Sequence, residues 1–118
     1  MTGLSVLRQV YGLMEQPERV TAAGGNESGL LALNQIYSDL WSRECTAAFE
    51  PLGNLREEVR LSWRSLPALT YGTAALLCLS GGEERAYDRF LEMYLRALPR
   101  RQSQPYRRGN ALFGEAAV

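Results

Sequence analysis

The residues that usually carry enzyme chemistry are few in this chain, and their spacing does not let them act together. The sequence contains no histidine and no lysine, the residue types that usually serve as the base for a serine or cysteine nucleophile. Two pairs of adjacent carboxylates remain, Glu57-Glu58 and Glu83-Glu84. Adjacent side chains point in different directions on a helix or a strand, so neither pair forms a natural acid–base couple. We therefore expect no catalytic residue and a protein that is not an enzyme.

Residue types that hold metals and cofactors are equally scarce. The two cysteines, Cys45 and Cys78, lie in separate apolar segments, and neither a histidine nor a Cys-x-x-Cys pattern is present to complete a transition-metal site. We interpret both cysteines as small buried side chains and not as a disulfide or metal pair. The Gly-Gly pairs at 24–25 and 81–82 lack the Gly-Lys-Ser/Thr that follows in a phosphate-binding loop, so we interpret them as turns. No metal and no cofactor is expected.

The most suggestive charged feature lies at the C-terminal end. Residues 1–98 contain nine arginines and twelve acidic residues, a net charge of −3, whereas residues 99–118 contain four arginines and one glutamate, a net charge of +3. Arginines grouped around a tyrosine can bind phosphates through charge-assisted hydrogen bonds. The candidate contacts with DNA or with a partner are Arg100, Arg101, Tyr106, Arg107 and Arg108. The alternative interpretation is a tail that only helps to keep the protein in solution.

A second group of candidates is apolar and would serve protein contacts. Trp63 lies close to Arg60 and Arg64 in the sequence, whereas most other aromatic residues recur on apolar faces that are typical of a core. Tryptophan is enriched in protein interfaces. Val59 and Leu61 alternate with Arg60, which allows a short extended piece whose exposed edge could pair with another subunit. We therefore name Trp63, Val59 and Leu61 as candidate interface residues.

Periodic apolar residues predict the helices that would position these candidates. Between Leu4 and Met14 they recur at intervals of three and four, which predicts a first helix that ends before Pro17. A second helix is expected over 29–46, with Ser28 as its N-cap and with Leu31 widening its apolar side.

The second half of the chain predicts two more helices. The third covers about 63–80 and is apolar on almost every side. Pro67 either bends this helix or marks the start of its main part. The fourth begins at Glu83, carries an apolar stripe that includes Leu95, and ends before Pro99.

These expectations define an all-α fold with four main helices packed around a central apolar helix at about 66–79. The segments 15–29 and 49–62 are expected to be irregular loops. Residues 1–98 would form a single helical domain, and residues 99–118 a basic, flexible tail. The chain has 118 residues, of which 46% are apolar, and this size is sufficient for one core.

No targeting or membrane segment is expected. The first residues lack the basic region of a signal peptide, and the longest apolar stretch, between Leu66 and Leu79, is shorter than a membrane span and contains Pro67 and Gly72. A cytoplasmic protein or a component of an assembled particle fits these observations.

Four segments together resemble a known family. They are Leu-Asn-Gln-Ile-Tyr-Ser-Asp-Leu-Trp at 33–41, Phe-Glu-Pro-Leu at 49–52, Leu-Thr-Tyr-Gly-Thr-Ala-Ala-Leu-Leu-Cys-Leu-Ser at 69–80, and the helical segment at 87–95. With these segments in order and with similar gaps, the sequence of residues 4–98 resembles small phage and prophage head–tail connector proteins.

The resemblance implies a structural adaptor that forms a ring between the portal and the tail components of a particle. Its partners would be further copies of itself, the portal and tail-side proteins, with passive contact to DNA and none to a membrane. It would occur in a virion or in the bacterial cytoplasm. The alternative function is a small nucleic-acid-binding regulatory protein, which would need an exposed basic helix. The fourth expected helix offers Arg85, Arg89 and Arg96 for that purpose, but acidic residues lie among them.

Overall fold

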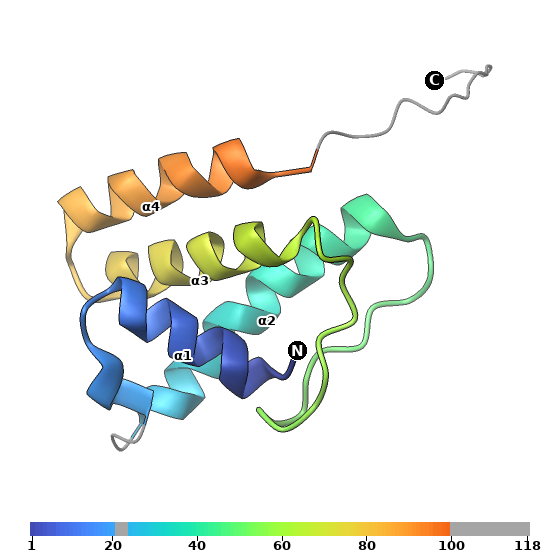
Figure 1. The fold of residues 1–118 in the computed structure, drawn as a ribbon, viewed down its shortest axis with the longest axis horizontal. Helices are drawn as coiled ribbons and strands as arrows, with labels where there is room; N and C mark the ends of the chain where they lie inside the picture. The colour runs from blue at the N-terminus through green and yellow to red at the C-terminus, as the bar shows by residue number, and fades with distance from the viewer. Residues whose placement is uncertain (21–23, 100–118) are drawn as a thin grey trace.

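Four α-helices and one short 3-10 helix form the described part of the chain, residues 1–20 and 24–99 of a computed structural model (Figure 1). They are α1 (Gly3–Leu13), η1 (Pro17–Val20), α2 (Gly25–Glu44), α3 (Leu66–Ser80) and α4 (Glu84–Ala97). The described residues form no sheet, and the only bridge found among them is the isolated pair Thr2 and Glu58. The predicted all-α fold is confirmed.

Helix α3 lies in the middle of the domain. It packs against α1, α2 and α4, whereas α1 and α4 make no contact with each other. Nine of its fifteen residues are buried, as expected for a helix that is apolar on nearly every side. The buried positions face three different neighbours, so α3 organises the core (Figure 1).

A glycine allows the neighbours of α3 to come close. A Cβ atom added at Gly72 would lie 2.8 Å from Ile36 Cγ2 on α2 and 2.9 Å from Tyr94 Cδ1 on α4. Such distances are shorter than normal van der Waals contact, so only a hydrogen atom fits between the three helices at this level. Gly72 therefore sets the spacing of α2, α3 and α4.

Helix α2 begins four residues earlier than the sequence predicts. Gly24 precedes it with a φ of 79°, in the left-handed region, and Ser28 lies inside the first turns and not at the N-cap. At Gly25 a Cβ atom would lie 2.1 Å from the carbonyl oxygen of Arg19. The two glycines thus let the helix start directly against the preceding chain. Part of the expected loop at 15–29 is therefore helical, in η1 and in the start of α2.

The other helix boundaries lie close to the predicted ones. Helix α1 ends at Leu13, and Glu15 with a φ of 60° turns the chain before Pro17. Helix α3 begins at Leu66, so Pro67 lies in its first turn, where the missing N–H group leaves no hydrogen bond unmade. Across the described helices, none is long and apolar enough to pass through a membrane.

Two leucines expected on apolar faces are on the surface. Leu31 of α2 is 74% exposed and Leu95 of α4 is 57% exposed. Both lie beyond the part of the helix surface that a neighbouring helix covers, so the buried stripes are narrower than the sequence indicates.

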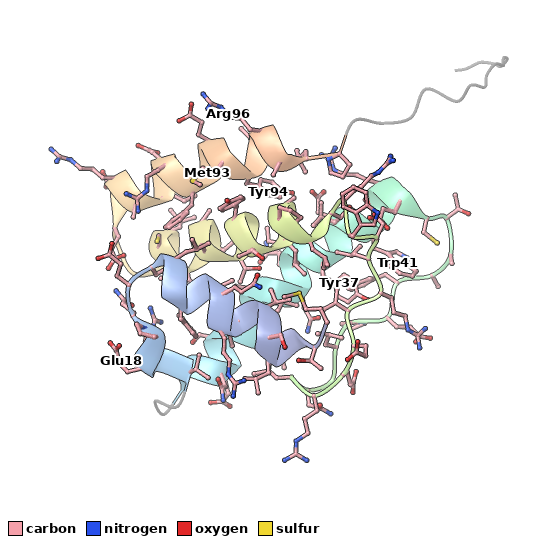
Figure 2. All side chains as sticks on the ribbon, in the orientation of Figure 1. Glu18, Tyr37, Trp41, Met93, Tyr94 and Arg96 are labelled. Atoms are coloured by element: carbon pink, nitrogen blue, oxygen red, sulfur yellow. The ribbon has the colours of Figure 1, made fainter. Side chains whose placement is uncertain are left out.

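A partly buried hydrogen bond joins α4 to α2. The hydroxyl of Tyr94 donates to Asp39 Oδ2 over 2.6 Å, while Arg43 Nε lies 3.5 Å from the same oxygen. Figure 2 shows Tyr94 directed towards the interior and Arg96, two residues later, directed away from it. Burial, and then the hydrogen bond and the charge of Asp39, raise the pKa of Tyr94 above its ordinary value of about 10.

The role of Gly72 leads to a first prediction. We expect Gly72→Ala to lower the free energy of unfolding by about 1 kcal/mol or more, because overpacking outweighs the better helix propensity of alanine. Gly12→Ala is the matched control, since no atom lies within 4 Å of its added Cβ. It should raise stability by about 0.5–1 kcal/mol. Urea unfolding followed by circular dichroism measures both, and a stabilised Gly72→Ala variant would contradict the close packing.

The raised pKa of Tyr94 leads to a second prediction. Above pH 10 the unfolded chain ionises its tyrosines, whereas folded Tyr94 stays neutral, so the free energy of unfolding should fall as the pH rises from about 10. The chain lacks lysine but contains six tyrosines, so the comparison of the two proteins isolates the contribution of Tyr94. The fall should be shallower in Tyr94→Phe, measured by urea unfolding between about pH 9 and 11. Equal slopes in the two proteins would show that the pKa is not raised.

Candidate interaction surface

Of the carboxylates singled out in the sequence, Glu57 and Glu58 bond to nearby parts of the chain. Glu57 accepts hydrogen bonds from the backbone N–H of Gly53 at 3.1 Å and from Asn54 Nδ2 at 3.2 Å. Glu58 Oε1 lies 2.8 Å from the amino group of Met1. Glu83 is the N-cap residue of α4. Within residues 1–20 and 24–99, no group of three histidine, cysteine or acidic side chains is placed to hold a metal ion.

The two cysteines are free thiols in different surroundings. Cys78 of α3 is buried, and burial together with the nearby charge of Glu83 raises the pKa of its thiol. A raised pKa keeps this thiol protonated and poorly nucleophilic at neutral pH. Cys45 follows α2 and is half-buried, with its Sγ accepting from the N–H of Ala47 at 3.3 Å. The sequence placed both cysteines inside helices, and Cys45 instead lies at a helix end.

The long connection between α2 and α3, residues 45–65, is anchored on α2. Asn34 Oδ1 accepts from the N–H of Leu52 at 2.8 Å, and Asn34 Nδ2 donates to the carbonyl of Leu52 at 3.0 Å. The Phe49 ring packs edge-on against Tyr37, with 5.0 Å between the ring centroids. The hydroxyl of Tyr37 accepts from the N–H of Arg60 at 2.9 Å. The connection is thus fixed at its middle and near its end.

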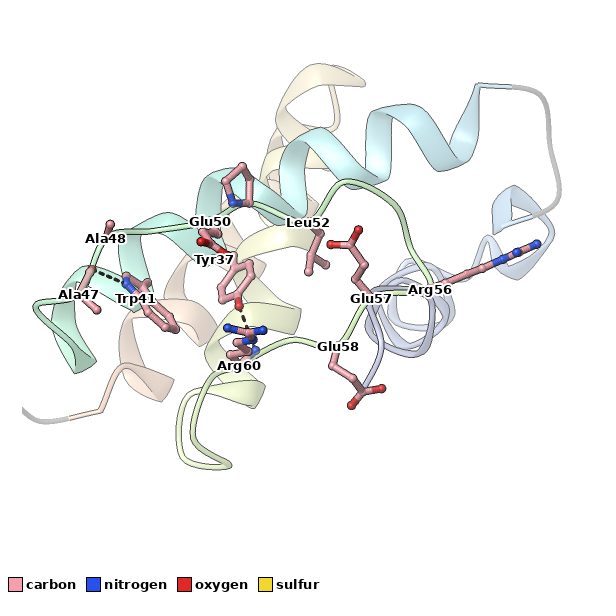
Figure 3. A pocket seen from close by; sticks show the side chains of 11 residues that line it. Tyr37, Trp41, Ala47, Ala48, Glu50, Leu52, Arg56, Glu57, Glu58 and Arg60 are labelled. Carbon is pink, nitrogen blue, oxygen red and sulfur yellow. Dashed lines mark hydrogen bonds between the residues drawn. The ribbon is translucent and has the colours of Figure 1, made fainter.

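A cleft of about 810 Å³ with a mixed polar and apolar lining opens beneath this connection (Figure 3). Its apolar floor includes Tyr37 and Trp41, and the Nε1 of Trp41 donates to the carbonyl of Ala47 at 2.8 Å. Three glutamates and two arginines also line it, and Figure 3 shows Arg56 pointing away from it. The hydroxyl of Tyr37 and the Nε1–H of Trp41 on this floor each bond to the backbone of the connection.

A second hollow, of about 610 Å³, lies between α1 and the start of α3. We call it the Trp63 groove. Trp63 forms one side of it and is 75% exposed, and the guanidinium of Arg64 lies 5.5 Å from the centroid of its ring. The lining is mainly apolar and consists of Met1, Gln9, Gly12, Leu13, Trp63, Leu66, Pro67, Thr70 and Tyr71. An exposed tryptophan beside an apolar hollow is typical of a surface that binds another protein segment.

One carboxylate fixes the turn that carries Trp63. Glu44, the last residue of α2, accepts hydrogen bonds from the N–H of Ser62 at 3.1 Å and from its hydroxyl at 2.8 Å. It also accepts from the hydroxyl of Ser65, which is completely buried. The turn is therefore held to α2 on both sides of Trp63. The negative charge also lies at the positive end of the α3 dipole, where it is favourable.

Sequence reasoning did not identify Glu44. The available signal was the pair of serines three residues apart just before an apolar helix, a pattern whose hydroxyls and N–H groups invite an acceptor. The acceptor comes from the end of the preceding helix, and this placement depends on the tertiary structure.

The other predicted contact residues have different outcomes. Leu61 is half-buried and packs against the core. Val59 is only 8% exposed, and its N–H donates to the carbonyl of Met1 at 2.8 Å. The extended piece therefore pairs with the N-terminal residues of its own chain, where Thr2 and Glu58 form the bridge, and the prediction of Val59 as an exposed interface residue is wrong. Exposure of Trp63 agrees with its prediction.

The candidate DNA or partner contacts Arg100, Arg101, Tyr106, Arg107 and Arg108 lie outside the described residues. Of the arginines on α4, Arg96 pairs with Glu92 at 2.7 Å, and the guanidinium of Arg89 lies 4.9 Å from the centroid of the Phe90 ring. These two arginines thus have partners within the helix.

The position of Glu44 leads to a third prediction. Glu44→Ala leaves the buried hydroxyl of Ser65 without its acceptor and frees the turn, so we expect a loss of about 1–2 kcal/mol in the free energy of unfolding. Proteolytic cleavage after Arg60 or Arg64 should become faster in the folded protein. Glu50→Ala, an exposed glutamate of the same connection, is the matched control and should change neither quantity. Equal cleavage rates in the two variants would rule out the anchoring role of Glu44.

No protein-family model, curated protein or solved structure matches the chain. The interpretation of its surface therefore depends on the geometry of the Trp63 groove and of the turn that holds it.

Proposed function

We propose that the chain is a structural adaptor of a phage or prophage particle, which forms a ring with copies of itself between the portal and the tail components. The observation that carries this proposal is the Trp63 groove. Tryptophan and arginine are the residue types that most often dominate the binding energy of an interface, and here they lie side by side at the edge of an apolar hollow. Such a surface suits adhesion to another protein segment.

Several residues that carry the family resemblance lie in the packing of the domain and not on the Trp63 groove. Two of the motif residues, Tyr37 and Phe49, pack against each other. A third, Gly72, lies where α2 and α4 approach α3. These residues build the domain, so the contacts that define an adaptor must come from elsewhere on its surface.

The groove also suits assembly into a ring. A closed ring requires each subunit to present one surface to the next copy and a different surface to the previous copy. The Trp63 groove lies on the face formed by α1 and the start of α3 and provides the first of these surfaces. The anchoring of the turn by Glu44 keeps Trp63 in position before the partner arrives, which lowers the entropic cost of association.

A nucleic-acid-binding regulator is less well supported. On α4, Arg96 pairs with Glu92 and Arg89 lies over the Phe90 ring, while Glu84 and Asp88 add negative charge to the same helix. Phosphates would be repelled by these carboxylates.

The fourth prediction tests the adaptor function. Co-expression with the portal and tail proteins encoded by neighbouring genes should yield a complex whose mass and images show a ring. Trp63→Ala should weaken its formation by roughly 30-fold, which corresponds to a strong interface residue. Leu31→Ala removes a similarly exposed side chain from α2 and serves as the control with unchanged assembly. Sedimentation and electron microscopy provide the measurement.

Two outcomes would contradict the proposal. One is a Trp63→Ala variant that assembles as well as the unchanged protein. The other is a monomer that shifts duplex DNA in a salt-dependent manner and never joins a particle protein, which would favour the regulator instead.

A further inference from the structure

We infer that the Trp63 groove binds the apolar segment Ala111-Leu112-Phe113 of the same chain when no partner is present. This inference rests on the proposed role of the groove as a binding surface, and it names the first occupant of that surface. Four observations carry it: the exposed apolar lining, the place where α4 ends, the length of chain that follows, and the chemistry of that chain.

The lining of the groove is unusually apolar for a surface in contact with water. Besides Trp63, both Met1 and Leu13 are more than one-third exposed, and all three side chains border the same hollow. Contiguous apolar surface of this kind marks a binding site for an apolar segment. The volume of about 610 Å³ falls within the range of pockets that enclose ligands larger than a single side chain.

The end of α4 lies at the same end of α3 as part of the groove. Helices α3 and α4 are joined by the short turn at Gly81-Gly82 and run antiparallel, so the last turn of α4 lies beside the first turn of α3 (Figure 1). Leu66 and Pro67, in that first turn of α3, line the groove. The chain beyond Pro99 therefore continues from the end of the domain at which the groove is formed.

The length of the following chain is sufficient. Eleven residues separate Pro99 from Ala111, and an extended chain of that length spans at most about 40 Å. Helix α3, with fifteen residues, is only about 22 Å long. A short tether gives its segment an effective concentration in the millimolar range, which exceeds that of a second copy in a micromolar solution. The chain's own segment is therefore favoured over the same segment of another copy.

The chemistry of the segment fits the groove. Residues 99–110 are mainly polar or basic, and Leu112 and Phe113 are the first pair of adjacent large apolar residues after Leu98. Phe113 can contact the ring of Trp63 or Tyr71, and Leu112 can cover the aliphatic lining. The net charge of +3 on residues 99–118 is attracted to the net charge of −3 on residues 1–98, which draws the tail towards the body of the domain.

Tryptophan fluorescence of the full chain tests this inference. Leu112→Asp with Phe113→Asp should shift the emission of Trp63 to longer wavelength and raise its quenching by acrylamide about twofold. The matched control, Asn110→Asp with Gly114→Asp, introduces the same charge and keeps both apolar side chains, so it should leave the emission unchanged. In a Trp63→Phe background, Leu112→Asp with Phe113→Asp should leave the emission unchanged, because the remaining signal comes from Trp41. Circular dichroism checks that helix content is equal throughout.

The concentration dependence of the quenching distinguishes the tail of the same chain from a second copy as the occupant of the groove. Docking within one chain requires the same quenching from about 1 to 100 µM at the mass of a monomer. An effect that appears only as the mass doubles would assign the groove to a second copy and overturn the inference. Unchanged quenching in the Leu112→Asp/Phe113→Asp variant would overturn it as well.

The same variants keep the two proposals apart. If Trp63→Ala abolishes ring assembly while the tail substitutions leave Trp63 quenching unchanged, only the docking of the tail fails. If the tail protects Trp63 but Trp63→Ala assembles normally, the adaptor function through this groove fails and the docking stands.

Discussion

The close approach of three helices at Gly72 is the constraint on which the rest of the structure depends. Ile36 of α2 and Tyr94 of α4 occupy the space that a larger residue of α3 would need. With α2 and α4 held at this distance, the Tyr94 hydroxyl reaches Asp39, and the end of α4 lies beside the start of α3. The place where the chain leaves the domain is thus decided by packing in the core.

Hydrogen bonds from Glu44 fix a surface turn to the helices of the core. Helix α2 is fixed by the core, and its last residue, Glu44, holds the turn before α3 through Ser62 and Ser65. Trp63 lies between these serines, with the guanidinium of Arg64 5.5 Å from the centroid of its ring and the groove beside it. The exposed side chain is therefore positioned by hydrogen bonds, while apolar packing positions the helices beneath it.

The sequence predicts the helices well because periodic apolar residues report directly on burial. It misplaces the start of α2, since the Gly24-Gly25 pair was interpreted as a turn and its fit against the Arg19 carbonyl is a tertiary contact. The sequence indicates an exposed Val59 because the residue that it pairs with, Met1, is distant along the chain. Trp63 was identified from its polar neighbours alone. The groove around it could not be predicted, because α1 and α3 supply its walls from distant positions.

The division between core and groove has an evolutionary consequence. The residues that maintain helix spacing, such as Gly72 and Tyr94, do not line the groove, while Trp63 and Pro67 do. Under the proposed function, exchange of the exposed side chains at the rim of the groove would alter which protein binds there without changing the spacing of the helices. Related chains with the same helices would then diversify in partner choice fastest at positions 63 and 67, while Ser65, which holds Glu44, would stay the same.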